Sequence, residues 1–119
     1  MNQRYRFLKV EEKMKLTGNQ IMYLLTIKKI GTSRHVIRSV DVAEQMDYSR
    51  ASIHKMLSTL KKLKLIEQEY YGSIRLTPLG SRAANSYLKK YELLESTLKP
   101  VVNLPEGYNL GICNLVELM

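Results

Sequence analysis

The sequence contains few cysteine, tryptophan, phenylalanine and histidine residues. It has one cysteine, Cys113, no tryptophan, one phenylalanine and two histidines. A lone cysteine excludes an internal disulfide framework and fits a reducing cytoplasm best. No nucleophile–base pair, phosphate-cradling glycine loop or paired-carboxylate site is present, so we do not expect an enzyme. The longest apolar run, residues 21–25, is too short to cross a membrane, and the basic start lacks the apolar stretch of a signal peptide.

Positive charge is abundant and unevenly placed. The 119 residues include 19 Lys and Arg against 11 Asp and Glu, which gives a net charge of +8. The excess lies in residues 1–99, whereas residues 100–119 carry only acidic groups. This distribution favours a polyanionic partner for the N-terminal two thirds and a different use for the C-terminus. The alternative is a basic surface that serves solubility.

Residues 38–65 are the stretch around which the chain is organised. They are predicted to form two short amphipathic helices joined by a polar turn, with Ser39 capping the first helix and Ser49 the second. The second helix has an apolar stripe at helical spacing, made of Ile53, Met56, Leu57, Leu60 and Leu63. Its other face is polar and basic. This arrangement is typical of a helix-turn-helix that enters the major groove; an ordinary helical hairpin is the alternative.

The flanking segments complete a recognisable order of elements. A capping box at Thr17 and Gln20 predicts a helix that ends near residues 30–31. Two short strands at residues 65–70 and 74–77 are predicted to form a hairpin, or wing, that can lie along a phosphate backbone.

The C-terminal part is predicted to be helical. Thr77 and Pro78 begin a helix that runs to about Leu98, and its broad apolar face suggests contact with a second subunit. A last short helix is expected to open at residues 104–106 and to provide packing surface.

The predicted fold is therefore mainly α with a small β-hairpin, a winged helix-turn-helix followed by a long dimerisation helix. Its parts are an N-terminal basic arm or helix at 1–16, a DNA-binding domain at 17–77 and a helical dimerisation region at 78–119. Arg50 and Lys55 are expected to contact base edges or phosphate. The full set of predicted DNA contacts is Ser39, Ser49, Arg50, Ala51, Ser52, Lys55, Ser73 and Arg75, with Tyr71 a further candidate on the wing.

Five segments add a family resemblance to this pattern. They are Tyr23–Ile27, Ile37–Ala43, Leu63–Ile66, Leu76–Gly80 and Tyr91–Glu95. Their sequences and spacing resemble the iron-dependent repressor family, the diphtheria-toxin-repressor and manganese-transport-regulator group, over residues 19–119. The resemblance implies a homodimeric transcription regulator that binds a palindromic operator in double-stranded DNA. It also implies a divalent metal, Mn²⁺ or Fe²⁺, bound between the winged helix and the dimerisation helices.

The ligand positions that the resemblance implies are largely altered. Met22 and Cys113 fall on ligand positions, and Glu95 matches an ancillary carboxylate. Tyr91 and Asn109 stand where histidines are expected. The Glu-His pair expected after Cys113 is replaced by Val116 and Glu117.

Chemistry argues against metal control by this set. Mn²⁺ and Fe²⁺ bind best to imidazole and carboxylate donors, and a phenol with a pKa near 10 is a poor ligand at neutral pH. We therefore predict a DNA-binding regulator that is not controlled by the family's usual metal and has no assigned cofactor. Two alternatives stay open: a Mn²⁺- or Fe²⁺-dependent repressor with the reduced set Met22, Glu95, Cys113 and Glu117, and a winged-helix module for protein contacts.

Overall fold

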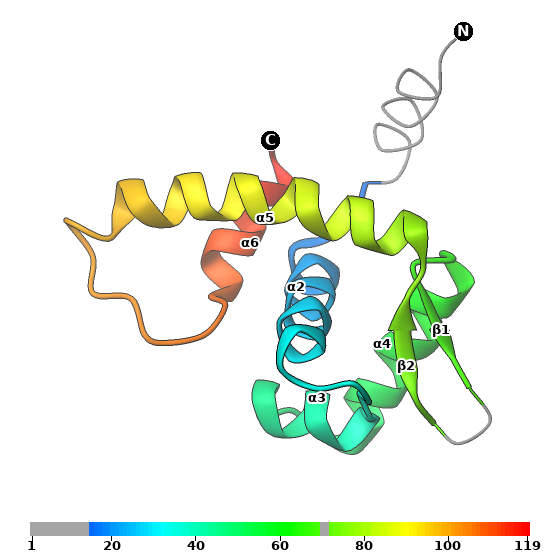
Figure 1. The fold of residues 1–119 in the computed structure, drawn as a ribbon. Coiled ribbons are helices and arrows are strands. Elements are labelled where there is room, and N and C mark those ends of the chain that lie inside the picture. Colours follow the sequence, from blue (N-terminus) through cyan, green and yellow to red (C-terminus); the bar gives the residue numbers. More distant parts are fainter. Residues whose placement is uncertain (1–14, 70–71) are drawn as a thin grey trace, which may run out of the picture.

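The central element of the fold is α2 (Gly18–Ser33), which is buried along most of its length. The computed structural model describes residues 15–69 and 72–119, so the predicted arm at residues 1–16 lies almost wholly outside the described residues. Figure 1 shows α5 and α6 at one end of α2 and the helix-turn-helix at the other. Because it contacts nearly every other element, α2 connects the two ends of the molecule.

The ends of α2 follow from local hydrogen bonds. The Thr17 hydroxyl accepts from the Gln20 N–H at 3.2 Å, and the Gln20 amide oxygen accepts from the Thr17 N–H at 3.0 Å. The predicted capping box is therefore confirmed. The helix continues past the predicted end at residues 30–31, and the Arg34 N–H still donates to the Ile30 carbonyl at 3.0 Å.

The helix-turn-helix consists of α3 (Ser39–Met46) and α4 (Arg50–Lys62). Asp47 ends α3 with a φ of 56°, a left-handed conformation that Asp tolerates better than most residues. Ser49 caps α4, because its hydroxyl accepts from the Ser52 N–H at 3.2 Å. That prediction is confirmed.

The predicted cap of α3 is wrong. The N-cap is Arg38, and Ser39 is already the first helical residue. The Asp41 carboxylate accepts from the Arg38 N–H at 2.9 Å, so a side chain from inside the first turn satisfies the helix start.

The wing is a two-stranded antiparallel hairpin of β1 (Ile66–Gln68) and β2 (Ile74–Leu76). Glu67 lies opposite Arg75 in the register. The Ile74 N–H donates to the Ile37 carbonyl at 2.8 Å, which ties the segment before α3 to the wing. The strands are shorter than predicted.

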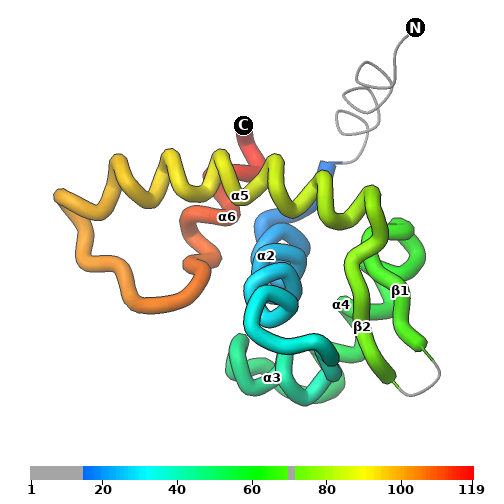
Figure 2. The backbone as a smooth tube through the Cα atoms, in the orientation of Figure 1, coloured from blue at the N-terminus to red at the C-terminus, as the bar shows by residue number. Residues whose placement is uncertain are grey.

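The helix α5 (Pro78–Leu98) begins as predicted, because the Thr77 hydroxyl accepts from the Gly80 N–H at 2.9 Å and Pro78 occupies the first turn. Figure 2 shows that residues 99–109 then form a wide arc from the end of α5 back to α6 (Leu110–Glu117). The expected helix start at 104–106 is wrong. Asn109 caps α6 instead, and its side-chain oxygen accepts from the Ile112 N–H at 3.1 Å.

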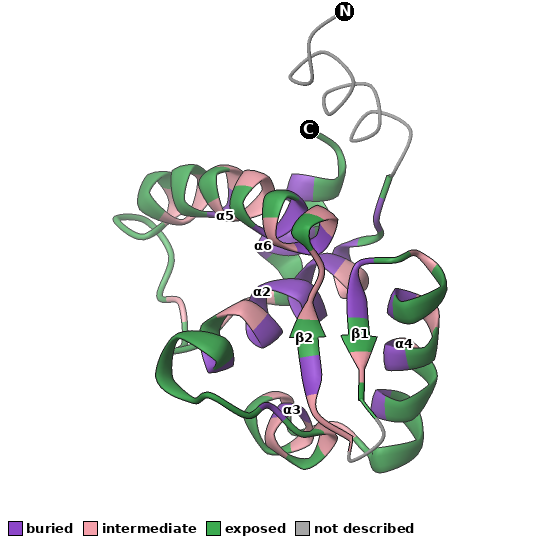
Figure 3. Ribbon diagram, turned by 45° about the vertical axis from the view of Figure 1, so that its right-hand side comes forward, coloured by how far each residue is buried: buried purple, intermediate pink, exposed green. Residues whose placement is uncertain are grey.

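The buried core joins all of these elements. Figure 3 shows the buried residues of α4 facing the hairpin, with most of the rest of that helix exposed. The largest fully buried side chains are Tyr23, Tyr91, Ile21, Leu24, Leu25, Ile27, Ile53, Leu57, Leu60, Leu65, Ile74 and Val42. Among the described residues, no helix combines the length and apolar character needed to span a membrane.

Candidate nucleic-acid interface and the altered metal positions

Among the helices and strands that the structure describes, α4 presents the most basic outer face. The inner side of the helix is fixed by Ile53, Leu57 and Leu60, all at most 1% exposed. The opposite side is solvent-exposed and includes the predicted contacts Arg50, Ala51, Ser52 and Lys55, together with His54, Ser58, Lys61 and Lys62. Four basic and no acidic side chains lie between residues 50 and 62. The burial pattern thus aims every charge of α4 away from the core.

The hydroxyls at the start of α4 have different roles. Ser49 accepts from the Ser52 N–H and donates its own proton to the Ser52 oxygen at 2.9 Å. The Ser49 hydroxyl is therefore used within the helix cap. The Ser52 O–H, which is exposed, is the better placed donor for an external ligand.

The N-terminus of α3 lies next to that of α4. Ser39, Val40 and Ala43 from α3 line a hollow of about 190 Å³ together with Arg50, Ile53 and His54 from α4. The structure thus brings the predicted contact Ser39 to the same surface as Arg50. It also adds His54 and Val40, which is 44% exposed, to this surface. Sequence reasoning missed Val40 because its apolar character pointed to the core.

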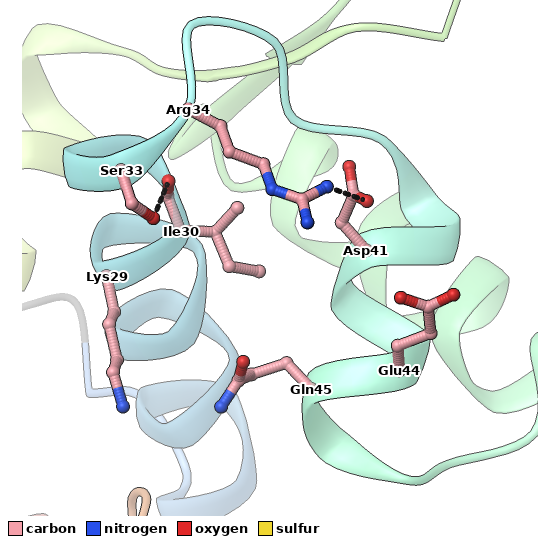
Figure 4. Close-up of a pocket in the computed structure, with 7 residues that line it drawn as sticks. All are labelled: Lys29, Ile30, Ser33, Arg34, Asp41, Glu44 and Gln45. Atoms are coloured by element: carbon pink, nitrogen blue, oxygen red, sulfur yellow. Dashed lines mark hydrogen bonds and ion pairs between the residues drawn. The ribbon is translucent and has the colours of Figure 1, made fainter.

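An ion pair sets the position of α3 relative to α2. Figure 4 shows the Arg34 guanidinium reaching across from the end of α2 to Asp41 on α3, at 2.7 Å. The Asp41 side chain is 13% exposed, and its second oxygen receives the Arg38 N–H. One carboxylate therefore connects the end of α2, the loop and the start of α3. These residues hold the helix-turn-helix rather than present charge to a ligand.

The wing offers less free charge than the sequence suggested. The Arg75 guanidinium lies 3.1 Å from Glu67 on the facing strand and 3.4 Å from Glu69, just past the end of that strand. Both carboxylates compete with any phosphate for this side chain. Ser73 is half-buried beside the tip, and Tyr71 lies outside the described residues. Ser73 and Arg75 lie together on the wing. The other predicted contacts lie on α3 and α4.

Tyr91 and Asn109, which stand where the resemblance expects histidines, contact each other directly. Tyr91 on α5 is 2% exposed, and its hydroxyl accepts from the Asn109 backbone N–H at 2.7 Å. The ring of Tyr108 stands edge-on to the ring of Tyr91, with 5.1 Å between centroids and 81° between planes. Burial raises the pKa of the Tyr91 phenol above its ordinary value of 10.0, against the lowering effect of the Asn109 N–H, and nearby Glu95 adds to the rise. The phenol is therefore neutral at pH 7, which makes it a poor ligand for Mn²⁺ or Fe²⁺.

Met22 lines a cavity that contains a lysine. This cavity, of about 310 Å³, lies between α2, α3 and the arc before α6, and its walls include Met22, Lys29, Gln45, Glu106 and Tyr108. The Lys29 ammonium is 5.8 Å from the centroid of the Tyr108 ring. The wall thus carries one ammonium and one carboxylate, Glu106, and no imidazole.

The remaining implied ligands are also unsuited. Cys113 is fully buried, and burial raises the pKa of its thiol from 9.0 to about 12, so the metal-binding thiolate is not populated at neutral pH. The Glu117 carboxylate accepts the Gly18 N–H and so caps the N-terminus of α2. Within residues 15–69 and 72–119, no three His, Cys, Asp or Glu side chains are grouped as metal ligands. The residues at these positions do not fit Mn²⁺ or Fe²⁺.

The fold and these surfaces define a winged helix-turn-helix with a trailing helical region, which confirms the predicted fold class. No family model matches the sequence, and no curated protein matches it. Solved structures do share its fold. IdeR from T. acidophilum has a TM-score of 0.63 and 27% identity over 71% of this chain and 40% of its own. The manganese regulator SloR has a TM-score of 0.65 and 24% identity over 87% and 46%.

A third structure, the hypothetical protein SSo2273 from Sulfolobus solfataricus, has a TM-score of 0.59 and 21% identity over 87% of this chain and 76% of its own. IdeR and SloR are regulators of the diphtheria-toxin-repressor family, so the resemblance inferred from the sequence is confirmed. The chain spans less than half the length of either of these two regulators.

Proposed function

We propose that the chain is a cytoplasmic transcription regulator that binds double-stranded DNA with α4 in the major groove. The observation that carries this proposal is the outer face of α4, where every ionisable side chain is basic and exposed while the inner face is buried. Such a face neutralises phosphates and presents donors to base edges. The likeness to SloR, a manganese regulator, supports a regulatory role.

Each predicted contact then has a chemical role. Arg50 and Lys55 are the donors for guanine edges or phosphate, and Ala51 is apolar enough to contact a thymine methyl group. Ser39 and Ser52 are hydroxyl donors for phosphate, as is Ser73 on the wing. Ser49 and Arg75 have a smaller role, because the Ser49 hydroxyl is used in the helix cap and Arg75 is paired with carboxylates.

The regulator is proposed to act as a homodimer through its C-terminal helical region. Large apolar side chains remain exposed there, namely Leu93, Val101, Val102, Leu110, Leu115, Leu118 and Met119. A second copy related by a two-fold axis would cover them and present two α4 helices to a palindrome. In sedimentation at micromolar concentration we expect Leu93→Glu to shift the protein toward monomer. The control Asn85→Glu, an exposed site on the same helix, should leave the dimer intact.

The regulator is also proposed to work without Mn²⁺ or Fe²⁺, because the chemistry at the implied ligand positions does not fit either ion. A metal-dependent repressor would bind its operator more tightly after either ion is added. Calorimetry on the chelator-treated protein distinguishes the two cases, since uptake of one ion per chain with stoichiometric heat would contradict the proposal.

Salt dependence of binding to random duplex DNA is the direct test of a DNA partner. Affinity should fall steeply with salt, and Lys55→Ala should reduce the slope by about one, because one phosphate contact is lost or weakened. Lys99→Ala removes the same charge at the end of α5 and should leave the slope unchanged. No binding at low salt would favour a winged-helix module for protein contacts.

A further inference from the structure

We propose that Tyr91, Tyr108 and Lys29 form a permanent clamp that positions the helix-turn-helix in place of a bound ion. The clamp joins α5, the residues just before α6, and α2 through direct contacts among these side chains. Its effect on DNA affinity rests on the proposed function, whereas its effect on the protein's own dynamics does not.

The first contact of the clamp closes the arc between α5 and α6. The Tyr91 hydroxyl accepts the Asn109 N–H at 2.7 Å, although the two residues lie 18 positions apart. Asn109 also caps α6 with its side-chain oxygen. One residue thus fixes the start of α6 and its distance from α5. Because Tyr91 is 2% exposed, water cannot easily replace the hydroxyl if it is removed.

The second and third contacts extend the clamp to α2. The rings of Tyr108 and Tyr91 pack in the T-shaped arrangement that aromatic pairs favour. The Lys29 ammonium lies 5.8 Å from the Tyr108 centroid, within the range of a cation–π contact. Glu92 and Glu95 on α5 lie near enough to add to the rise in the pKa of Tyr108 that burial causes.

Lys29 connects the clamp to the helix-turn-helix. Besides the cavity at Tyr108, Lys29 lines a second hollow, of about 260 Å³, shared with Arg34, Asp41 and Gln45. Figure 4 shows Lys29 on the α2 wall of this hollow, five residues before Arg34, which pairs with Asp41 on α3. A change in the clamp would therefore shift α2, and with it the ion pair that holds the start of α3. The clamp residues act as positioning residues and not as DNA contacts.

Tyr91→Phe tests the clamp with little change in volume. The full chain is purified in chelator, and two quantities are measured: hydrogen exchange of the Asn109 amide and affinity for a duplex selected from a random pool. We expect exchange at Asn109 to rise roughly 5- to 10-fold, because the amide loses its acceptor. We expect affinity for the selected duplex to fall about 5-fold, the lower end of typical coupling between sites. Asn85→Ala, at an exposed position earlier on α5, is the control and should change neither quantity.

Lys29→Met tests the arm of the clamp that reaches α2. It should weaken binding to the selected duplex by about 5-fold, with Lys28→Met as the control for loss of one positive charge on the same helix. Equal losses in both variants would show that only charge matters and would overturn the positioning role of Lys29.

The same two quantities are also measured on the wild-type chain after Mn²⁺ or Fe²⁺ is added. Neither ion should change exchange at Asn109 or DNA affinity by more than about 2-fold in the wild-type chain. A larger change, or Tyr91→Phe without effect on exchange, overturns the clamp. Faster exchange with unchanged DNA affinity overturns its link to DNA. A wild-type chain that binds no duplex contradicts the proposed function, and exchange at Asn109 then decides on the clamp alone.

Discussion

Replacing Gly80 with alanine should destabilise the junction between the wing and α5. A Cβ at residue 80 would lie 1.9 Å from the Leu65 carbonyl oxygen and 2.9 Å from its carbon. That carbonyl cannot move freely, because it accepts from the Thr77 N–H at 3.0 Å and from the Thr77 hydroxyl at 3.2 Å. The backbone must therefore separate at the point where the wing leads into α5.

The expected cost follows from three contributions. Overpacking costs about 1–3 kcal/mol, and weakening the bonds to Thr77 costs roughly 1 kcal/mol more. Alanine returns up to about 1 kcal/mol in helix propensity. We expect a net loss of about 1–4 kcal/mol in the free energy of unfolding.

Urea denaturation followed by far-ultraviolet circular dichroism measures this loss. Gly31→Ala is the control, since its Cβ meets only the end of the Ile37 side chain at 3.3 Å and should change stability by less than about 1 kcal/mol. A Gly80→Ala protein as stable as the wild type, or more stable, would refute the packing argument. It would also remove the reason that we give for glycine in the Leu76–Gly80 segment.

Three further predictions concern the site and its support. Lys55→Ala should weaken binding to a specific duplex by about 1–3 kcal/mol and relax one base position, as measured across single-base variants, whereas Lys99→Ala should do neither. Asp41→Ala should lower the free energy of unfolding by about 1–2 kcal/mol in urea titrations, because the Asp41 carboxylate both caps α3 and pairs with Arg34 at the end of α2. Glu44→Ala, on the exposed side of α3, should be nearly neutral. Stability should fall as the pH rises above 9, by at most about 1.4 kcal/mol per pH unit for Cys113, because its pKa of about 12 in the folded chain exceeds the value of 9.0 expected when unfolded. Cys113→Ala should flatten the part of that decline between pH 9 and 10.

Local signals account for the features that could be predicted. Ser49 and Thr77 cap their helices through bonds to residues three positions away, so the sequence alone locates the starts of α4 and α5. The stripe of α4 and the alternation in the wing are likewise short-range patterns. These features were enough to predict the winged helix-turn-helix.

The errors arise where distant residues decide the structure. The start of α6 depends on Asn109, whose N–H is held by Tyr91 from another helix. The pairing of Arg75 depends on the strand register that brings Glu67 opposite it. At the start of α3, a serine suggested a cap, but Asp41 bonds the backbone and also pairs with α2. A carboxylate with two partners is favoured over a hydroxyl, and only the folded arrangement reveals the second partner.

The most direct test of the central claim is the affinity of the chelator-treated full chain for a duplex selected from a random pool. The account predicts that selection returns a palindrome with half-sites about one helical turn apart, or a multiple of it. It predicts that binding in chelator matches binding with Mn²⁺, and that Arg50→Ala weakens binding to the selected duplex more than to random DNA. Binding that appears only after a metal is added, or a selection without any sequence preference, would contradict the account.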